Sequence, residues 1–256
     1  MLGETPSAIA LRHLLSQINE KRRTLRHKAV ITTTGTNMMT RMLKTAAAVL
    51  ALALGASPVL AKQGDFLVRL RAITVQPQEK VGPVLPTFPT SGGRITNAYA
   101  PEIDFTYMLT DHIGVELIAA TTKHCVEGGG ALAGVGRLAC TWVQPPTLTL
   151  QYHFAPEGKI HPYVGAGVNW TMFYNEKAST QLVNAIGATN VNLSNSFSFV
   201  LQAGVDFDIT EKMFINIDAK YVDMDTNARL TTGALVNNLR ADINPLIIGV
   251  GVGWRL

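Results

Sequence analysis

Charged and polar side chains recur at a spacing of two residues along this chain. Arg69 and Arg71 stand two residues apart in an otherwise apolar stretch, and Asp218 and Lys220 repeat this spacing. Residues i and i+2 lie on one face of a β-strand. The residues expected to share this polar face are Arg69, Arg71, Glu102, Asp104, Glu116, Gln151, His153, Asp206, Asp218, Lys220 and Arg255. Side chains of these types form ion pairs and hydrogen bonds, and a histidine among them can also transfer a proton.

His153 is the one candidate for a general base on this face. The lipid A deacylases place a histidine and a serine two residues apart on a lipid-facing strand, and this chain contains no His-x-Ser. His153 instead stands between Tyr152 and Phe154 in an alternating stretch, which favours a packed polar wall residue. We therefore predict that the chain is not an enzyme and has no catalytic residues.

The two cysteines, Cys125 and Cys140, fall in one predicted loop. An even number of cysteines in an exported protein favours a disulfide, and two unpaired thiols are the alternative. Only His124 offers a nitrogen ligand nearby and no four-ligand spacing is present, so no metal site is expected. The glycines at 165/167 and 249/251/253 recur at period 2 inside strands, where a phosphate loop does not form. No cofactor is expected.

Strands must position these residues, because apolar and polar residues alternate with period 2 over eight stretches of about ten residues, the pattern of a membrane barrel. The stretches are 64–75, 98–109, 113–122, 147–154, 161–174, 196–209, 215–221 and 246–255. Short connections follow the second, fourth and sixth stretches, at 110–112, 155–160 and 210–212. Long connections follow the others, at 76–97, 123–142, 175–195 and 225–241.

This alternation of short and long connections predicts an eight-stranded antiparallel transmembrane β-barrel, with short periplasmic turns and long extracellular loops. Hydrophobic residues make up 47% of the chain and charged residues 16%, well under the roughly 25% typical of soluble domains. A soluble β-sandwich also alternates, but it hides its apolar face and exposes its polar one. Aromatic residues near the strand ends favour a membrane interface instead, namely Tyr99, Trp142, Trp170, Tyr174 and Trp254.

The N-terminal region has the pattern of a targeting segment. A basic stretch at 41–44, an apolar run at 45–56 and a small-residue exit at Ala61 are typical of a secretory signal peptide. We therefore expect a misassigned extension at 1–37, a signal peptide at 38–61 and an outer-membrane barrel at 62–256. From residue 62 onward the chain has 14 Lys and Arg against 16 Asp and Glu, which gives no support for nucleic-acid binding.

Several motifs resemble the OmpW family of outer-membrane proteins, which includes the AlkL-type alkane-uptake proteins. The resemblance lies in the segments 66–72, 145–154, 162–169, 202–206 and 244–255, and it covers nearly all of 62–256. One departure is the last residue, since the family usually ends in Phe, the aromatic read by the barrel-assembly machinery, and this chain ends in Leu256. Trp254 keeps an aromatic residue two positions earlier.

The resemblance implies passive uptake of small hydrophobic molecules, which enter an exterior funnel and leave sideways into the bilayer. Residues that would line the funnel are Val81, Val84, Leu85, Phe88, Leu132, Val135, Leu182, Val183 and Ile186, and ordinary loop packing is the alternative for them. The charged residues of the polar face would then form a paired plug below it. Expected partners are outer-membrane lipids, small hydrophobic ligands and, during biogenesis, the barrel-assembly machinery. The competing hypothesis is a structural or surface-interaction barrel that binds a partner through its loops.

Overall fold

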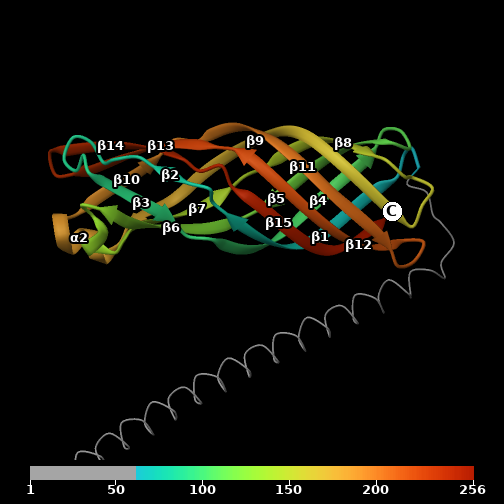
Figure 1. The fold of residues 1–256 in the computed structure, drawn as a ribbon, viewed down its shortest axis with the longest axis horizontal. Coiled ribbons are helices and arrows are strands. Elements are labelled where there is room, and N and C mark those ends of the chain that lie inside the picture. The colour runs from blue at the N-terminus through green and yellow to red at the C-terminus, as the bar shows by residue number, and fades with distance from the viewer. Residues whose placement is uncertain (1–61) are drawn as a thin grey trace, which may run out of the picture. The chain divides into compact units, whose positions relative to one another are not determined.

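Eight antiparallel strands form a closed barrel in the computed structural model, which describes residues 62–256 (Figure 1). The predicted extension and signal peptide lie outside the described residues. The barrel strands, in order around the ring, are β1 (Phe66–Gln76), β4 (Ala98–Met108), β5 (Ile113–Ala120), β8 (Thr147–His153), β9 (Ile160–Ala178), β11 (Ser196–Asp208), β12 (Met213–Asp223) and β15 (Leu246–Arg255). Pairing of β1 with β15 closes the ring and confirms the predicted fold class.

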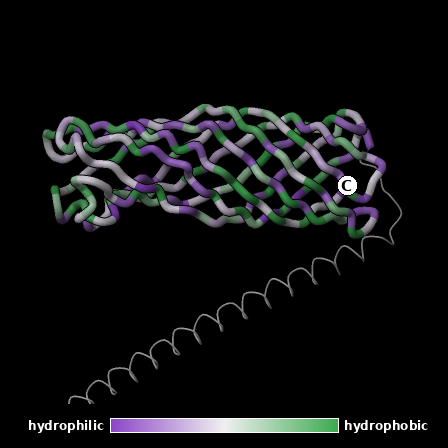
Figure 2. The backbone as a smooth tube through the Cα atoms, in the orientation of Figure 1, coloured by the Kyte–Doolittle hydropathy of each residue, from purple (hydrophilic) through white to green (hydrophobic). Residues whose placement is uncertain are grey.

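Alternation along the barrel strands separates a polar interior from an apolar exterior. Figure 2 shows hydrophilic and hydrophobic residues interleaved along these strands. In β1 the side chains of Leu67, Arg69, Arg71 and Ile73 are buried inside, whereas Leu70 faces outward. The same strict alternation runs through β8 and β12. An apolar outer wall around a polar interior suits a barrel that is surrounded by lipid. Because β1 pairs with β15, neither the first nor the last barrel strand leaves a free sheet edge.

Short turns and the end of the chain share one end of the barrel, which we name the turn end. The turns between β4 and β5, between β8 and β9 and between β11 and β12 lie there. At this end the backbone N–H of Leu256 donates to the carbonyl of Phe66 at 2.9 Å. Among residues 62–256, no helix has the length and apolar character needed to cross a bilayer.

The opposite end, which we name the extension end, holds the four predicted long connections, and most of their length is folded into further strands. β3 (Ser91–Ile95), β6 (Thr122–Gly130) and β7 (Arg137–Gln144) continue the barrel sheet, and β9 runs on to Ala178. A second sheet has the order β10-β13-β14-β2. Its strands are β10 (Thr189–Leu193), β13 (Asp225–Thr232), β14 (Leu235–Asp242) and β2 (Lys80–Val81).

These strands escaped the sequence analysis because their partners are distant in the chain and their local pattern is weak. β6 ends in the run Gly128–Gly130, and β3 contains Gly92 and Gly93. Glycine has low strand propensity and leaves no side chain from which a period-2 pattern can be read. Pairing of β3 with β6 nevertheless supplies the backbone partners that hold both strands.

One short helix, α2 (Thr180–Ile186), caps the extension end. Ser179 precedes it, and its side chain accepts a hydrogen bond from the backbone N–H of Leu182 at 3.0 Å. Gly187 follows the helix with a positive φ of 97°. A serine before a helix and a glycine after it are ordinary helix signals. The sequence therefore contained the signal for α2, inside a segment interpreted as a loop.

Candidate functional site

The barrel interior holds a network of buried charges. All eleven residues predicted for the polar face are buried there, and the two arginines of β1 lie at its centre with 0% and 2% of their surface exposed. We name the charged plug as the network formed by Arg69, Arg71, Glu102, Asp104, Glu116, Tyr163, Asp206, Asn216, Asp218 and Lys220. In the structure all of these side chains therefore lie on the inner face of the barrel wall.

Arg69 and Arg71 connect strands from opposite sides of the barrel. Arg69 donates to Asp206 at 2.8 Å and to the hydroxyl of Thr106 at 2.7 Å. Arg71 donates to Glu102 at 3.0 Å and to Asn216 at 2.6 Å, and its guanidinium lies 3.1 Å from Asp104. Because buried charges are costly unless they are paired and hydrogen-bonded, these contacts are what allow arginines inside the barrel.

Tyr163 and Lys220 also donate hydrogen bonds within the charged plug. The Tyr163 hydroxyl donates to Asp218 at 3.0 Å and accepts from Arg71 at 3.2 Å. The Lys220 ammonium lies 2.7 Å from Glu102 and 2.6 Å from Asp218. The sequence analysis placed Tyr163 in a strand but did not name it as a site residue. Tyr163 alternates with the outward-facing Val164 in β9, and this alternation would have predicted that Tyr163 faces the barrel interior.

A second buried cluster lies at the turn end, and the sequence analysis named only Arg255 from it. Arg255 donates to Asp208 at 2.7 Å, and His161 lies 2.9 Å from the other oxygen of the same carboxylate. The cluster ties β15 to β11 and β9, next to the seam where the first and last strands meet. These contacts hold the three strands together at the turn end.

Within residues 62–256, the contacts of the His153 ring are with Gln151 and Tyr163. Its Nε2 lies 3.2 Å from the amide oxygen of Gln151, and its ring packs against Tyr163 at a centroid distance of 5.2 Å. General-base catalysis requires a proton donor of the reacting system within hydrogen-bond reach. Within residues 62–256, no group of three or more His, Cys, Asp or Glu side chains is arranged to hold a metal ion.

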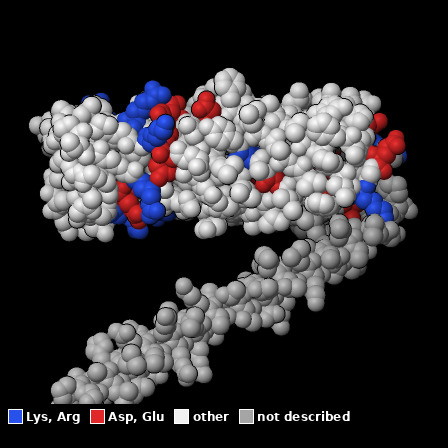
Figure 3. Space-filling view, viewed as in Figure 1, with Lys and Arg blue, Asp and Glu red and all other residues white. Residues whose placement is uncertain are grey.

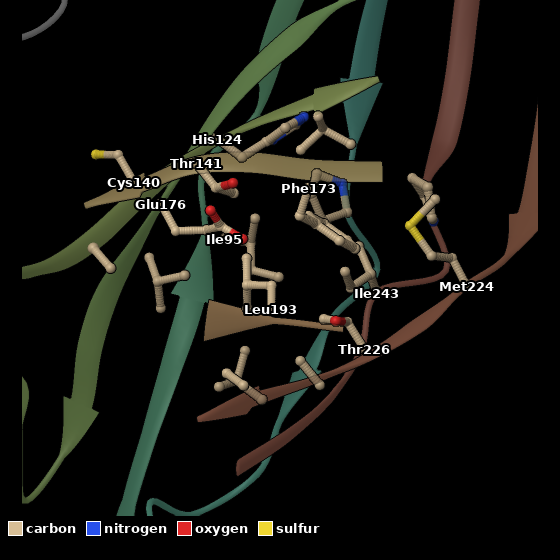
Figure 4. Close-up of a pocket in the computed structure, with 18 of the residues that line it drawn as sticks. Ile95, His124, Cys140, Thr141, Phe173, Glu176, Leu193, Met224, Thr226 and Ile243 are labelled. Carbon is tan, nitrogen blue, oxygen red and sulfur yellow. The ribbon is translucent and has the colours of Figure 1, made fainter. Parts of the chain in front are cut away.

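Between the charged plug and the extension end lies an apolar pocket with about 1680 Å³ of empty space, including the part that opens to solvent (Figure 4). Its floor includes Glu102 and Lys220, which also belong to the charged plug. Its walls are apolar side chains from both sheets, such as Val143, Phe173, Leu193, Met224 and Ile243. The pocket therefore joins the extension end to the charged plug without an intervening layer.

Six of the nine predicted funnel residues line this pocket: Val81, Val84, Phe88, Leu132, Leu182 and Ile186. Leu85, Val135 and Val183 do not. Leu85 is 48% exposed. Val84 forms an isolated antiparallel β-bridge with Phe88, and Leu85 forms another with Asn238. This local alternation sends Val84 inward and Leu85 outward, so the prediction for Leu85 was wrong.

A belt of charged residues crosses the face of the molecule seen in Figure 3 where the extension begins, and beyond it the surface in view carries few charges. The strands of the extension also carry exposed ion pairs, between Arg94 and Glu127 at 3.1 Å and between Arg240 and Asp225 at 3.1 Å. Exposed aromatic rings occur on the barrel wall, including Tyr99, Trp170 and Tyr174, and Trp142 stacks on Tyr174. Aromatic rings followed by charges mark the passage from hydrocarbon to the polar interface.

Cys125 and Cys140 face each other on the paired strands β6 and β7, and their sulfurs are bonded. The bridge spans 15 residues, a loop size for which unfolded-state restriction amounts to about 3 kcal/mol. Replacing both cysteines with serine is expected to speed amide hydrogen exchange in β6 and β7 and to leave exchange in β1 and β12 unchanged. Exchange measured by mass spectrometry tests this, and equal rates in β6 and β7 of both proteins would contradict it.

Comparison with known proteins agrees with this architecture. A profile of the OmpW family matches residues 62–256. Outer membrane protein W of Salmonella typhimurium is 34% identical over 211 residues, which cover 82% of this chain and 97% of that protein. The dibenzothiophene metabolism operon protein PahQ of Pseudomonas aeruginosa is 28% identical over 153 residues, which cover 59% of this chain and 68% of that protein.

Among solved structures, the crystal structure of the outer membrane protein OprG from Pseudomonas aeruginosa matches with a TM-score of 0.71 and 27% identity. The match covers 78% of this chain and 98% of that one. The fold, the family profile and the relative that is 34% identical all agree on an outer-membrane barrel. This chain belongs to the OmpW family.

Proposed function

We propose that this barrel mediates passive uptake of small hydrophobic molecules across the outer membrane, without catalysis. The observation that carries the proposal is the apolar pocket at the extension end, which ends on the charged plug. An apolar molecule gains free energy by leaving water for such a pocket. The name of one relative, which refers to dibenzothiophene metabolism, and the resemblance to AlkL-type proteins support an apolar ligand.

The charged plug favours a sideways exit over passage through the barrel. Side chains fill the interior of an eight-stranded barrel, and here they are ion-paired groups such as Arg71 with Glu102 at 3.0 Å. An apolar ligand cannot replace these contacts, so passage along the axis would leave buried charges unpaired. Release into the bilayer requires no such loss.

An interruption in the barrel wall supports this exit. The β4–β5 ladder begins at Glu102 and Ala120, and the β3–β6 ladder ends at Ile95 and Val126. Between them stands Pro101, which has no backbone N–H to donate. Thr122 and His124 line the pocket on the β6 side of this interruption. We propose that ligand leaves the pocket here, between the backbone hydrogen bond from Thr96 to Cys125 and the start of the β4–β5 ladder.

Assembly is the remaining part of the proposal. The last strand, β15, places Trp254 two residues before the terminal Leu256 and pairs with β1 over its whole length. We propose that the barrel-assembly machinery recognises this strand during biogenesis.

A charge placed in the pocket is expected to block uptake. Phe88 lines the pocket, so Phe88→Asp introduces a carboxylate that an apolar ligand cannot solvate, and uptake should fall at least about tenfold, the equivalent of 1.4 kcal/mol. Uptake of a labelled alkane by cells lacking and then expressing each variant measures this.

Leu85→Asp is the matched control, since it adds the same charge three residues away on the exposed side of the same segment. Its uptake should equal that of the parent chain. Heat-dependent gel mobility and surface labelling show that each variant is folded and exposed. If both variants take up the alkane as fast as the parent chain, the ligand does not pass through this pocket. That result would favour a structural or partner-binding barrel.

A further inference from the structure

The side chain of Glu176 contributes a carboxylate to the pocket wall. Glu176 lies near the end of β9, is partly buried and lines the pocket. Figure 4 shows its side chain close to Thr141 and Ile95 in the pocket wall. The ion pairs formed within residues 62–256 do not include Glu176.

The other ionisable groups of the pocket are neutralised. Glu102 and Lys220, at the floor, pair with each other at 2.7 Å. His124, in β6 beyond the barrel strands, has its ring nitrogens 2.8 Å from the carbonyl of Thr96 and 3.1 Å from the hydroxyl of Thr122. Burial lowers the pKa of His124, which favours its neutral imidazole. The formal charge of the pocket is therefore that of Glu176.

The tips of the extension add no compensating charge. Segments 82–93, 128–136, 180–193 and 230–239 contain no Asp, Glu, Lys or Arg. Figure 3 shows the corresponding uncharged surface beyond the charged belt. A ligand that enters from this side would meet Glu176 before the paired charges of Glu102 and Lys220 at the floor.

We propose that Glu176 makes the pocket selective for the head group of an amphiphile: it admits neutral molecules, favours those with a cationic end, and disfavours carboxylates. This selectivity rests on the proposed uptake function. The apolar tail of the ligand packs against the cluster of Val84, Leu132, Leu138 and Leu182, while its head group lies near Glu176. Charge interactions are stronger at a partly buried site than in water, so one carboxylate is sufficient to separate ligands of opposite charge.

Three eight-carbon probes test this, namely octylammonium, 1-octanol and octanoate. The full chain, purified from outer membranes and held in phosphatidylcholine nanodiscs, is titrated with each probe by calorimetry, with empty nanodiscs as the reference. The parent protein is expected to bind octylammonium at least about tenfold more tightly than octanoate, with 1-octanol between them. Glu176→Gln should bring this ratio to within about twofold and leave 1-octanol affinity unchanged.

Two further variants sharpen the result. Glu79→Gln removes a carboxylate that precedes β2 and does not line the pocket, so it should behave as the parent. Glu176→Lys should reverse the order and favour octanoate, which a general loss of folding would not produce. If 1-octanol binds and both Glu176 variants keep the parent ratio, Glu176 does not select ligands. If 1-octanol does not bind the parent at all, the proposed uptake function itself fails.

Discussion

Arg71→Ala is expected to destabilise the barrel by about 3 to 5 kcal/mol, the usual cost of removing one partner from a buried ion pair. The Arg71 guanidinium lies 3.0 Å from Glu102, 3.1 Å from Asp104 and 3.3 Å from Glu116. Its removal leaves three buried carboxylates with less compensation and empties the volume of its side chain. Urea unfolding in lipid vesicles, followed by loss of the folded band on unheated gels, measures the change.

Arg94→Ala is the control for this prediction. Arg94 also pairs with a glutamate, Glu127 at 3.1 Å, but its side chain is 72% exposed. Exposed pairs contribute about 0 to 1 kcal/mol, so the Arg94 variant should unfold close to the parent. Arg71→Lys keeps the charge but loses the planar fork that reaches several partners, and it should fall between the two. Equal stability of Arg71→Ala and Arg94→Ala would show that the charged plug is not needed to stabilise the barrel.

Gly251→Ala is expected to cost about 3 kcal/mol, the upper part of the usual range for overpacking. Gly251 pairs with Arg71 across the seam between β15 and β1. A methyl group at this position meets backbone, because the carbonyl of Leu70 and the Cα of Arg71 occupy the space. Backbone in a closed barrel cannot move aside without shifting the strand that carries the two central arginines. The yield of folded barrel and its urea midpoint measure the effect.

Two other glycines provide a second test and a control for this prediction. Gly167→Ala should behave like Gly251→Ala, because its methyl group meets the carbonyl of Leu148 and the Cα of Thr149 on β8. Gly134→Ala is the matched control, since nothing lies within 4 Å of an added Cβ there. Normal yield and stability of Gly251→Ala and Gly167→Ala would mean that the strands approach less closely than the structure shows.

The faces of the barrel strands were predictable from the sequence because alternation is local. In a strand the side-chain period is two, so one apolar face and one polar face place Arg69 inside and Leu70 outside without knowledge of any partner strand. The same reasoning placed Asp218 and Lys220 inside. The eight strands and the short turns at one end followed from this single periodicity.

The contacts of these side chains were decided only by the tertiary structure. Arg71 reaches Asn216, 145 residues away in sequence, because β12 lies beside β15 and β15 beside β1. Alternation shows which face of the strand a residue occupies. It does not show the residue's height along the barrel axis, which depends on the register between strands. For this reason the sequence predicted a polar interior without predicting that Tyr163 would join Arg71 to Asp218.

The extension and its pocket depended still more on distant pairing. Glycine-rich β3 and β6 became strands because each supplies the other with backbone partners, and Leu85 turned outward because of a bridge to Asn238. Glu176 attracted no notice in the sequence, since its importance comes from the absence of a basic neighbour within the described pocket. By itself the sequence determined the membrane barrel and its two faces, which need only a local period. The pocket and its one unpaired charge came from strand register and sheet closure, which bring together residues that no local pattern connects.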